Sequence, residues 1–94
     1  MAEIEVKEVE SGGVEWVYDV HVREDDTESR HRVTVSKGDY EDLTGGEVAP
    51  EKLVERSFEF LLEREPKEAI LSTFDLSIIW RYFPEYKGGI KDYF

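Results

Sequence analysis

Residues 14–23, VEWVYDVHVR, decide the fold of this chain because apolar and polar side chains alternate along them. The apolar side chains that share one face of this stretch are Val14, Trp16, Tyr18, Val20 and Val22. A period of two residues is the spacing of a β-strand, in which successive side chains point to opposite faces of the sheet. The stretch therefore predicts a strand with one face in the core and the other open to solvent.

A second strand with the same pattern follows at residues 31–35, HRVTV. The two apolar faces coincide only if the loop between the strands changes the register by an even number of residues. An antiparallel pair of this kind places Tyr18 and Val20 opposite Val33 or its neighbours. We therefore expect a hairpin whose tip is the acidic segment 24–28.

A further strand precedes the first hairpin and offers Ile4 and Val6 to the same core. The turn at residues 11–13 contains two glycines, and its length sets the register. A three-residue loop with glycine in a G1 bulge places Val6 opposite Tyr18, so that the apolar faces agree. A two-residue turn would instead bring Ile4 opposite His21. We therefore predict the bulged hairpin.

Helical segments are predicted after residue 36 from capping residues and apolar spacing. Ser36 and Asp75 are good N-caps, Pro50 suits a first helical position, and Pro66 and Gly45 are typical of helix ends. The main helix carries its apolar residues on one stripe, as an amphipathic helix does. The predicted helices cover residues 37–43, 50–65, 67–72 and 76–83.

These elements predict an α+β fold in a single domain over residues 1–94, since 94 residues suit one hydrophobic core. Residues 1–36 form a three-stranded antiparallel β-meander. Residues 37–84 form a main helix and two or three short helices packed on one face of the sheet. Residues 85–94 form an aromatic tail.

The charge of the chain argues against several classes of partner. It has 23 Asp and Glu against 12 Lys and Arg, and a formal net charge of -11 at pH 7. An acidic surface repels phosphate backbones and anionic lipids, so we expect neither membrane binding nor direct nucleic-acid binding. The N-terminus lacks the basic and apolar regions of a signal peptide, and cysteine is absent, so we expect a cytoplasmic location.

No motif of a catalytic, cofactor-binding or metal site stands out. No Lys-Ser or Lys-Thr follows any glycine pair, as a phosphate loop requires, and no serine lies in a G-x-S-x-G elbow. The alternation places His21 and His31 on opposite faces of the sheet, so we expect them neither to share a metal nor to form a dyad. We therefore predict no catalytic residue, no cofactor and no metal. A pair of carboxylates in a cleft is the one enzymatic hypothesis left open.

The C-terminal third is rich in large apolar residues and suggests a contact surface for another protein. A three-stranded sheet with one covered face has limited room for all of them, and surplus aromatic surface is typical of an interface. We expect a protein partner, or self-association, at Trp80, Tyr82, Tyr86, Ile90, Tyr93 and Phe94. The alternative is that the tail wraps around its own domain.

A second functional hypothesis rests on glutamates that recur every four residues along the main helix. This acidic ridge consists of Glu51, Glu55, Glu59 and Glu63. It suggests an acidic regulator that binds a basic protein surface, as a mimic of nucleic acid. The simpler interpretation is a solvated helix face, since glutamate favours helix surfaces. Salt separates the hypotheses, because a contact led by charge weakens with ionic strength.

Three short stretches resemble a family of small prokaryotic proteins that has no assigned activity. They are residues 57–66, SFEFLLEREP, residues 74–76, FDL, and residues 82–86, YFPEY. The resemblance covers less than half of the chain. Since the family brings no known activity, it implies no functional residue, cofactor or partner here.

Overall fold

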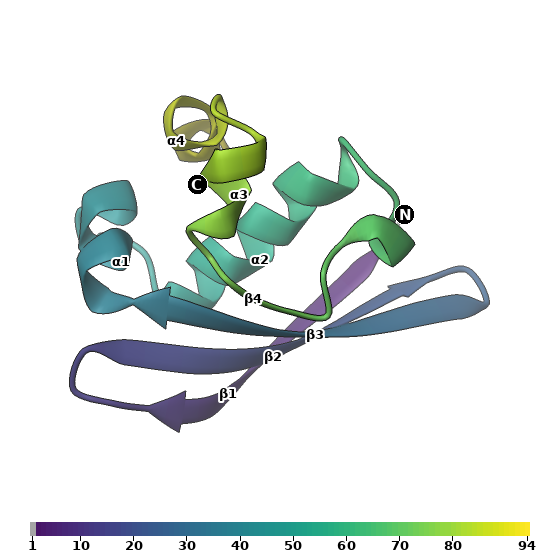
Figure 1. Cartoon of the computed structure of the whole chain (residues 1–94), viewed down its shortest axis with the longest axis horizontal. Helices are drawn as coiled ribbons and strands as arrows, with labels where there is room; N and C mark the ends of the chain where they lie inside the picture. Colours follow the sequence, from purple (N-terminus) through teal and green to yellow (C-terminus); the bar gives the residue numbers. More distant parts are fainter. Residues whose placement is uncertain (1) are drawn as a thin grey trace.

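In the computed structural model, which describes residues 2–94, all the helices lie on one side of a single β-sheet (Figure 1). The strands are β1 (Glu3–Ser11), β2 (Glu15–Glu24), β3 (Thr27–Ser36) and β4 (Thr73–Asp75). The α-helices are α1 (Lys37–Thr44), α2 (Pro50–Leu62), α3 (Ile78–Tyr82) and α4 (Tyr86–Gly89), and the 3-10 helices are η1 (Lys67–Ala69) and η2 (Ile90–Tyr93). The predicted α+β class is confirmed.

The sheet has four strands in the order β1-β2-β3-β4, of which the first three form the predicted antiparallel meander. β4 pairs with β3 in parallel, with Phe74 opposite Val33. The prediction of three strands was incomplete, because three residues are too few to display a period of two. What makes residues 73–75 a strand is their pairing with β3, which the local sequence does not encode.

The hairpin of β2 and β3 has the predicted register, with Tyr18 opposite Val33 and Val20 opposite His31. The register predicted for β1 was wrong by two residues: Val6 lies opposite Val20, not Tyr18. A tight turn replaces the predicted three-residue loop. It is closed by a hydrogen bond of 2.8 Å from the Gly12 N–H to the Glu15 carbonyl. The extra residue is accommodated in the strand, where a bulge interrupts the ladder between residues 8 and 10. The shift is even, so the apolar faces still coincide.

Helix α1 begins as predicted and ends at Thr44, one residue after the predicted position. The Ser36 hydroxyl accepts a hydrogen bond from the Asp39 N–H at 3.0 Å, and Gly45 ends the helix in the left-handed region at φ 66°. Helix α2 begins at Pro50 but ends three residues before the predicted position. The last turn tightens, because the Arg64 N–H donates to the Leu61 carbonyl at 2.9 Å as the chain approaches the following proline.

The two predicted helices after α2 are shorter than expected. Only residues 67–69 of the segment 67–72 are helical, because the chain then extends to reach β3, where the Arg32 N–H donates to the Ser72 carbonyl at 2.7 Å. The Asp75 carboxylate accepts from the Ser77 N–H at 3.0 Å, and α3 begins at Ile78. The predicted N-cap is therefore the capping residue of a turn that precedes the helix.

The core lies between the covered face of the sheet and the helices. Its fully buried side chains include Tyr18, Val20, Val22, Val33, Val35, Leu53, Val54, Phe58, Phe60, Leu76, Tyr86 and Ile90. Burial of one such side chain is favourable by about 1.5–3 kcal/mol. The C-terminal segment thus supplies part of the core that covers one face of the sheet.

Candidate functional site

The six residues predicted to bind a partner do not form one surface. Tyr86 and Ile90 are fully buried, and Trp80 and Tyr93 are half-buried against the core. Only Tyr82 and Phe94 are exposed. The prediction is wrong for Tyr86 and Ile90, because the tail folds back onto α2 and uses them to complete the core of its own domain.

Aromatic side chains of α2 and of the C-terminal segment pack together in a cluster, which consists of Phe60, Trp80, Phe83, Tyr86 and Tyr93. The ring of Tyr86 meets that of Phe60 edge-on, with centroids 5.1 Å apart, and stacks on Trp80 at 5.9 Å. Its hydroxyl bonds to the Ser57 hydroxyl at 2.6 Å, and Ser57 donates to the Leu53 carbonyl at 2.7 Å. Burial raises the pKa of Tyr86. The cluster therefore fastens the C-terminal segment to α2.

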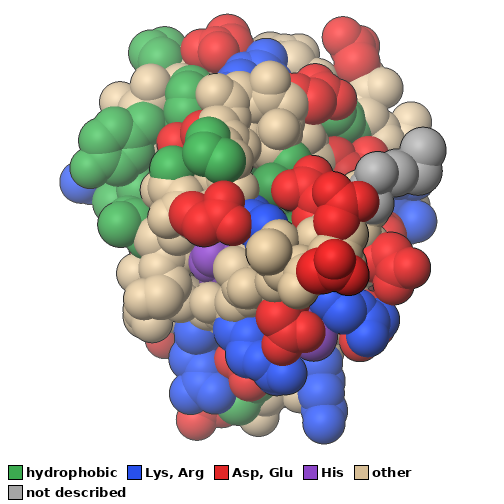
Figure 2. Space-filling view, turned by 90° about the vertical axis from the view of Figure 1, so that its right-hand side faces the viewer, with side chains coloured by type: hydrophobic (Ala, Val, Ile, Leu, Met, Phe, Trp, Pro, Cys, Tyr) green, Lys and Arg blue, Asp and Glu red, His purple; other side chains and the backbone are tan. Residues whose placement is uncertain are grey.

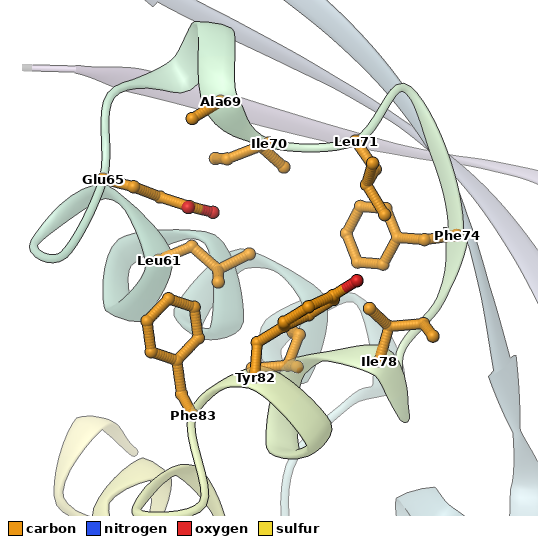
Figure 3. Close-up of a pocket in the computed structure, with 10 residues that line it drawn as sticks. Leu61, Glu65, Ala69, Ile70, Leu71, Phe74, Ile78, Tyr82 and Phe83 are labelled. Carbon is orange, nitrogen blue, oxygen red and sulfur yellow. The ribbon is translucent and has the colours of Figure 1, made fainter.

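The exposed part of the same region borders an apolar groove with a volume of about 440 Å³. It lies between the C-terminal end of α2, the segment from η1 to β4, and α3 (Figure 3). The residues that line it are Leu61, Glu65, Ala69, Ile70, Leu71, Phe74, Ile78, Ile79, Tyr82 and Phe83. Its volume falls within the range of about 300–1,000 Å³ that is typical of ligand pockets.

Two large side chains of the groove are open to solvent. Tyr82 is 70% exposed and Leu71 is 51% exposed, and in Figure 3 the Tyr82 side chain extends toward the side of the groove where Leu71 and Phe74 lie. Figure 2 shows hydrophobic side chains gathered on one side of the molecule, next to acidic groups. Exposed apolar groups in a concave site, beside polar ones, are typical of binding surfaces.

Glu65 is the only residue with a charged side chain among those that line the groove. It is half-buried, and its carboxylate points into the groove (Figure 3). Within residues 2–94 it makes no ion pair. The groove therefore combines apolar walls with one carboxylate that has no cationic partner in the described part of the chain.

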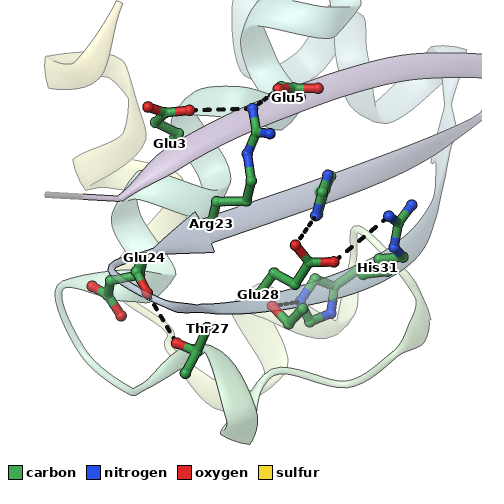
Figure 4. A network of polar contacts seen from close by, with 10 residues as sticks. Glu3, Glu5, Arg23, Glu24, Thr27, Glu28 and His31 are labelled. Carbon is green, nitrogen blue, oxygen red and sulfur yellow. Dashed lines mark hydrogen bonds and ion pairs between the residues drawn. The ribbon is translucent and has the colours of Figure 1, made fainter.

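The wall that carries Leu71 is held by a buried histidine of β3. His31 Nδ1 lies 2.7 Å from the Leu71 carbonyl oxygen, and its Nε2 lies 2.8 Å from the Ser29 hydroxyl (Figure 4). A carbonyl only accepts, so Nδ1 carries the proton and donates it. Burial lowers the pKa of His31, which keeps the ring neutral, and Nε2 then accepts from Ser29. His31 thus has a structural role beneath the groove.

The uncovered face of the sheet carries paired charges. Arg32 binds both carboxylate oxygens of Asp19, at 2.8 and 3.2 Å, which lowers the pKa of Asp19. Arg23 bonds to two glutamates of β1, and Glu28 lies 3.4 Å from His21 (Figure 4). As predicted, the two histidines lie on opposite faces. A hollow of about 400 Å³ is lined largely by polar and charged groups, among which Arg32 pairs with Asp19.

The predicted acidic ridge lies along α2, but part of its charge is already paired. Glu55 lies 3.3 Å from Lys52 and Glu59 lies 2.6 Å from Arg56. Glu63 accepts a hydrogen bond from the hydroxyl of Tyr93. Glu51, Glu55 and Glu59 are half-buried and only Glu63 is exposed. The ridge therefore presents less free charge than the sequence alone suggests.

Sequence reasoning found Tyr82 but missed the other residues of the groove. Ile70 and Leu71 were assigned to a helix, and Glu65 to the end of another. The sequence did hold one signal for an exposed apolar residue: the pair Ile70 and Leu71 follows Pro66 and the charged residues after it, in a segment too short to bury both side chains. Which of the two faces solvent depends on the pairing with β3.

No group of three or more His, Cys, Asp or Glu residues is placed to hold a metal ion within residues 2–94. No described helix is long and apolar enough to cross a membrane.

No protein-family model matches the chain, and the searches of curated proteins and of solved structures found no significant similarity. The resemblance of residues 57–66, 74–76 and 82–86 to small prokaryotic proteins therefore carries no argument about function.

Proposed function

We propose that this chain is a small protein-interaction module and that the apolar groove is its contact surface. The observation that carries the proposal is a groove of about 440 Å³ that leaves Tyr82 and Leu71 open to solvent. Aromatic side chains near the centre of an interface contribute much of its binding energy. A cytoplasmic location for this module stays a prediction from the sequence.

Rigid support of the groove favours binding without rearrangement. Its floor is formed by side chains that are buried in the core, including Leu61 and Ile79, and one wall is anchored by His31. A preformed site loses less conformational entropy on binding than a mobile one. We therefore expect a partner that binds without changing the conformation of the groove.

The proposal is tested with a variant that makes the groove polar, Leu71→Ser with Tyr82→Ser, and with a matched control, Val9→Ser with Val14→Ser. The control also removes two exposed hydrophobic residues, but these lie around the β1–β2 hairpin. Each immobilised protein receives a lysate of the source organism, and bound proteins are identified after washes of rising salt. We expect a partner that survives high salt on the wild type and the control and is lost from the groove variant.

Three results would contradict the proposal. They are an empty wild-type column, a groove variant that retains every partner, and a control variant that loses the same partners. The acidic regulator stays the alternative prediction. It would be favoured if basic proteins left the column at moderate salt, were unaffected by the groove variant and were lost when Glu55 and Glu59 were changed to Lys.

A further inference from the structure

Several backbone groups of the groove walls already have hydrogen-bond partners within the chain. The bonds already made are Leu71 O with His31 Nδ1 (2.7 Å), Ser72 O with Arg32 N–H (2.7 Å), Ile70 N–H with Lys67 O (3.2 Å) and Phe83 N–H with Ile79 O (2.8 Å). The adjacent edge strand, β4, is three residues long. An extended peptide binds through main-chain hydrogen bonds to such an edge. A helix satisfies its own backbone and needs only apolar contacts.

The charge of the site favours a basic occupant. The Glu65 carboxylate points into the groove and has no ion-pair partner within residues 2–94 (Figure 3). The chain as a whole carries a formal charge of -11, so it attracts cationic partners at long range. A lysine or arginine beside the apolar anchors of the occupant would pair with Glu65.

A second copy of this chain fits the groove poorly. Two chains of charge -11 repel each other, and a symmetric contact would bring two Glu65 carboxylates to one interface. The longest helix, α2, also buries its apolar side chains in its own core, among them Leu53, Phe58 and Leu61. It has no apolar stripe left to offer a neighbouring molecule.

We propose that the groove binds a positively charged amphipathic helix of a partner protein. Apolar side chains of that helix, spaced one turn apart, would contact Leu71, Ile78 and Tyr82, and a lysine or arginine next to them would pair with Glu65. This inference rests on the proposed function, because it names the occupant of the same groove.

The test uses a display library of random peptides, each long enough for several helical turns. The library is selected in parallel against the wild type, against Leu71→Ser with Tyr82→Ser, and against Glu65→Lys. The tightest wild-type peptide is then synthesised. Its affinity is measured by fluorescence anisotropy, and its helicity on binding by circular dichroism. Glu47→Lys is the control for charge, because Glu47 is exposed, lies outside the groove and makes no ion pair within residues 2–94.

The expected peptides have apolar residues at i, i+3 or i+4, and i+7, are enriched in Lys and Arg, and become helical on binding. Glu65→Lys should weaken the tightest peptide about fivefold or more at low salt and less at high salt. Glu65→Gln should have a smaller effect. Glu47→Lys changes the net charge as much as Glu65→Lys does and should leave the affinity nearly unchanged.

Different results would contradict the proposed function and the inference about its helical partner. Groove-dependent peptides that bind in extended form, or show no preference for basic residues, would overturn the inference and leave the proposed function standing. A dimer in sedimentation equilibrium that dissociates in the Leu71→Ser, Tyr82→Ser variant would also overturn it, with a second copy as the occupant. The absence of any peptide whose binding depends on the groove would contradict both proposals.

Discussion

Tyr82 and Tyr86 lie four residues apart in the same aromatic segment, yet one is 70% exposed and the other is fully buried. Tyr82 ends α3 and borders the groove. Tyr86 begins α4 and reaches the core through Ser57 and Phe60. Pro84 stands between them, where α3 stops and the chain turns. The turn sends the two side chains to different surroundings.

Aromatic content alone therefore does not mark an interface. Both tyrosines belong to a segment rich in apolar side chains, but Tyr86 packs against α2 and is buried there. One difference between them is a partner for the hydroxyl: the Tyr86 hydroxyl lies 2.6 Å from that of Ser57, so its polar group is hydrogen-bonded within the core. Tyr82 is 70% exposed, so its ring is available for binding.

The largest loss of stability is expected when Tyr86 is changed to Ala. Removal of a fully buried ring leaves a cavity between Phe60 and Trp80, so we expect the free energy of unfolding to fall by about 3–5 kcal/mol. Urea denaturation followed by circular dichroism measures it. A loss below about 1 kcal/mol would mean that the tail does not belong to the folded core.

The groove side is tested by His31→Ala, which leaves the Leu71 carbonyl and the Ser29 hydroxyl without their partner. We expect a loss of about 1–3 kcal/mol at neutral pH. The pH dependence has a definite sign. Because burial lowers the pKa of His31 in the folded state, the unfolded state binds the proton more readily below the ordinary value of 6.5.

The stabilising contribution of neutral His31 should therefore be fully present above the unfolded pKa. It should be lost as the pH falls from the unfolded pKa of His31 through its lower folded pKa. His31→Ala should remove this acid dependence, whereas His21→Gln, on the uncovered face, should retain it. Denaturant titrations at a series of pH values decide the question. If the free energy of unfolding of His31→Ala fell with decreasing pH as steeply as that of the wild type, another group would be responsible for the acid dependence.

A finer test changes Tyr86 to Phe and so removes only the hydroxyl. Ser57 keeps its bond to the Leu53 carbonyl at 2.7 Å, so no donor is left buried without a partner. We expect a loss of about 1 kcal/mol, the usual contribution of one hydrogen bond. A loss as large as that of Tyr86→Ala would mean that the hydroxyl, not the ring, holds the segment.

The smallest effect on stability is expected for Tyr82→Ala. Its ring is mostly in solvent, so the free energy of unfolding should change by no more than about 0.5 kcal/mol. Binding at the groove should nevertheless weaken, as the peptide titrations above measure. A large loss of stability would show that Tyr82 serves the fold and would remove it from the proposed surface.

Several elements of the fold were predictable because their signals are local. The alternation along β2 and β3, the Ser36 cap, the Gly45 stop and Pro50 at a helix start each appear within a few residues. The register of β1 and the strand β4 were not predictable. A bulge and a parallel pairing both depend on what the chain meets across the sheet.

The candidate site was predictable only in part. The apolar wealth of the C-terminal third pointed to Tyr82, and also to Tyr86 and Ile90, which the tertiary structure buries. Glu65 and Leu71 join the groove only because η1 and β4 bring that segment beside α3. Such proximity has no signature in a single sequence.

Composition and residue spacing were enough to predict an acidic α+β fold with an amphipathic sheet, an amphipathic main helix and many aromatic side chains in the C-terminal third. These properties follow from composition and from periods of two and 3.6 residues, which are local. Which aromatic side chains complete the core and which border the groove follows from packing between distant parts of the chain. That choice depends on hydrogen-bond partners and neighbouring rings far away in the chain, such as Ser57 and Phe60 for Tyr86.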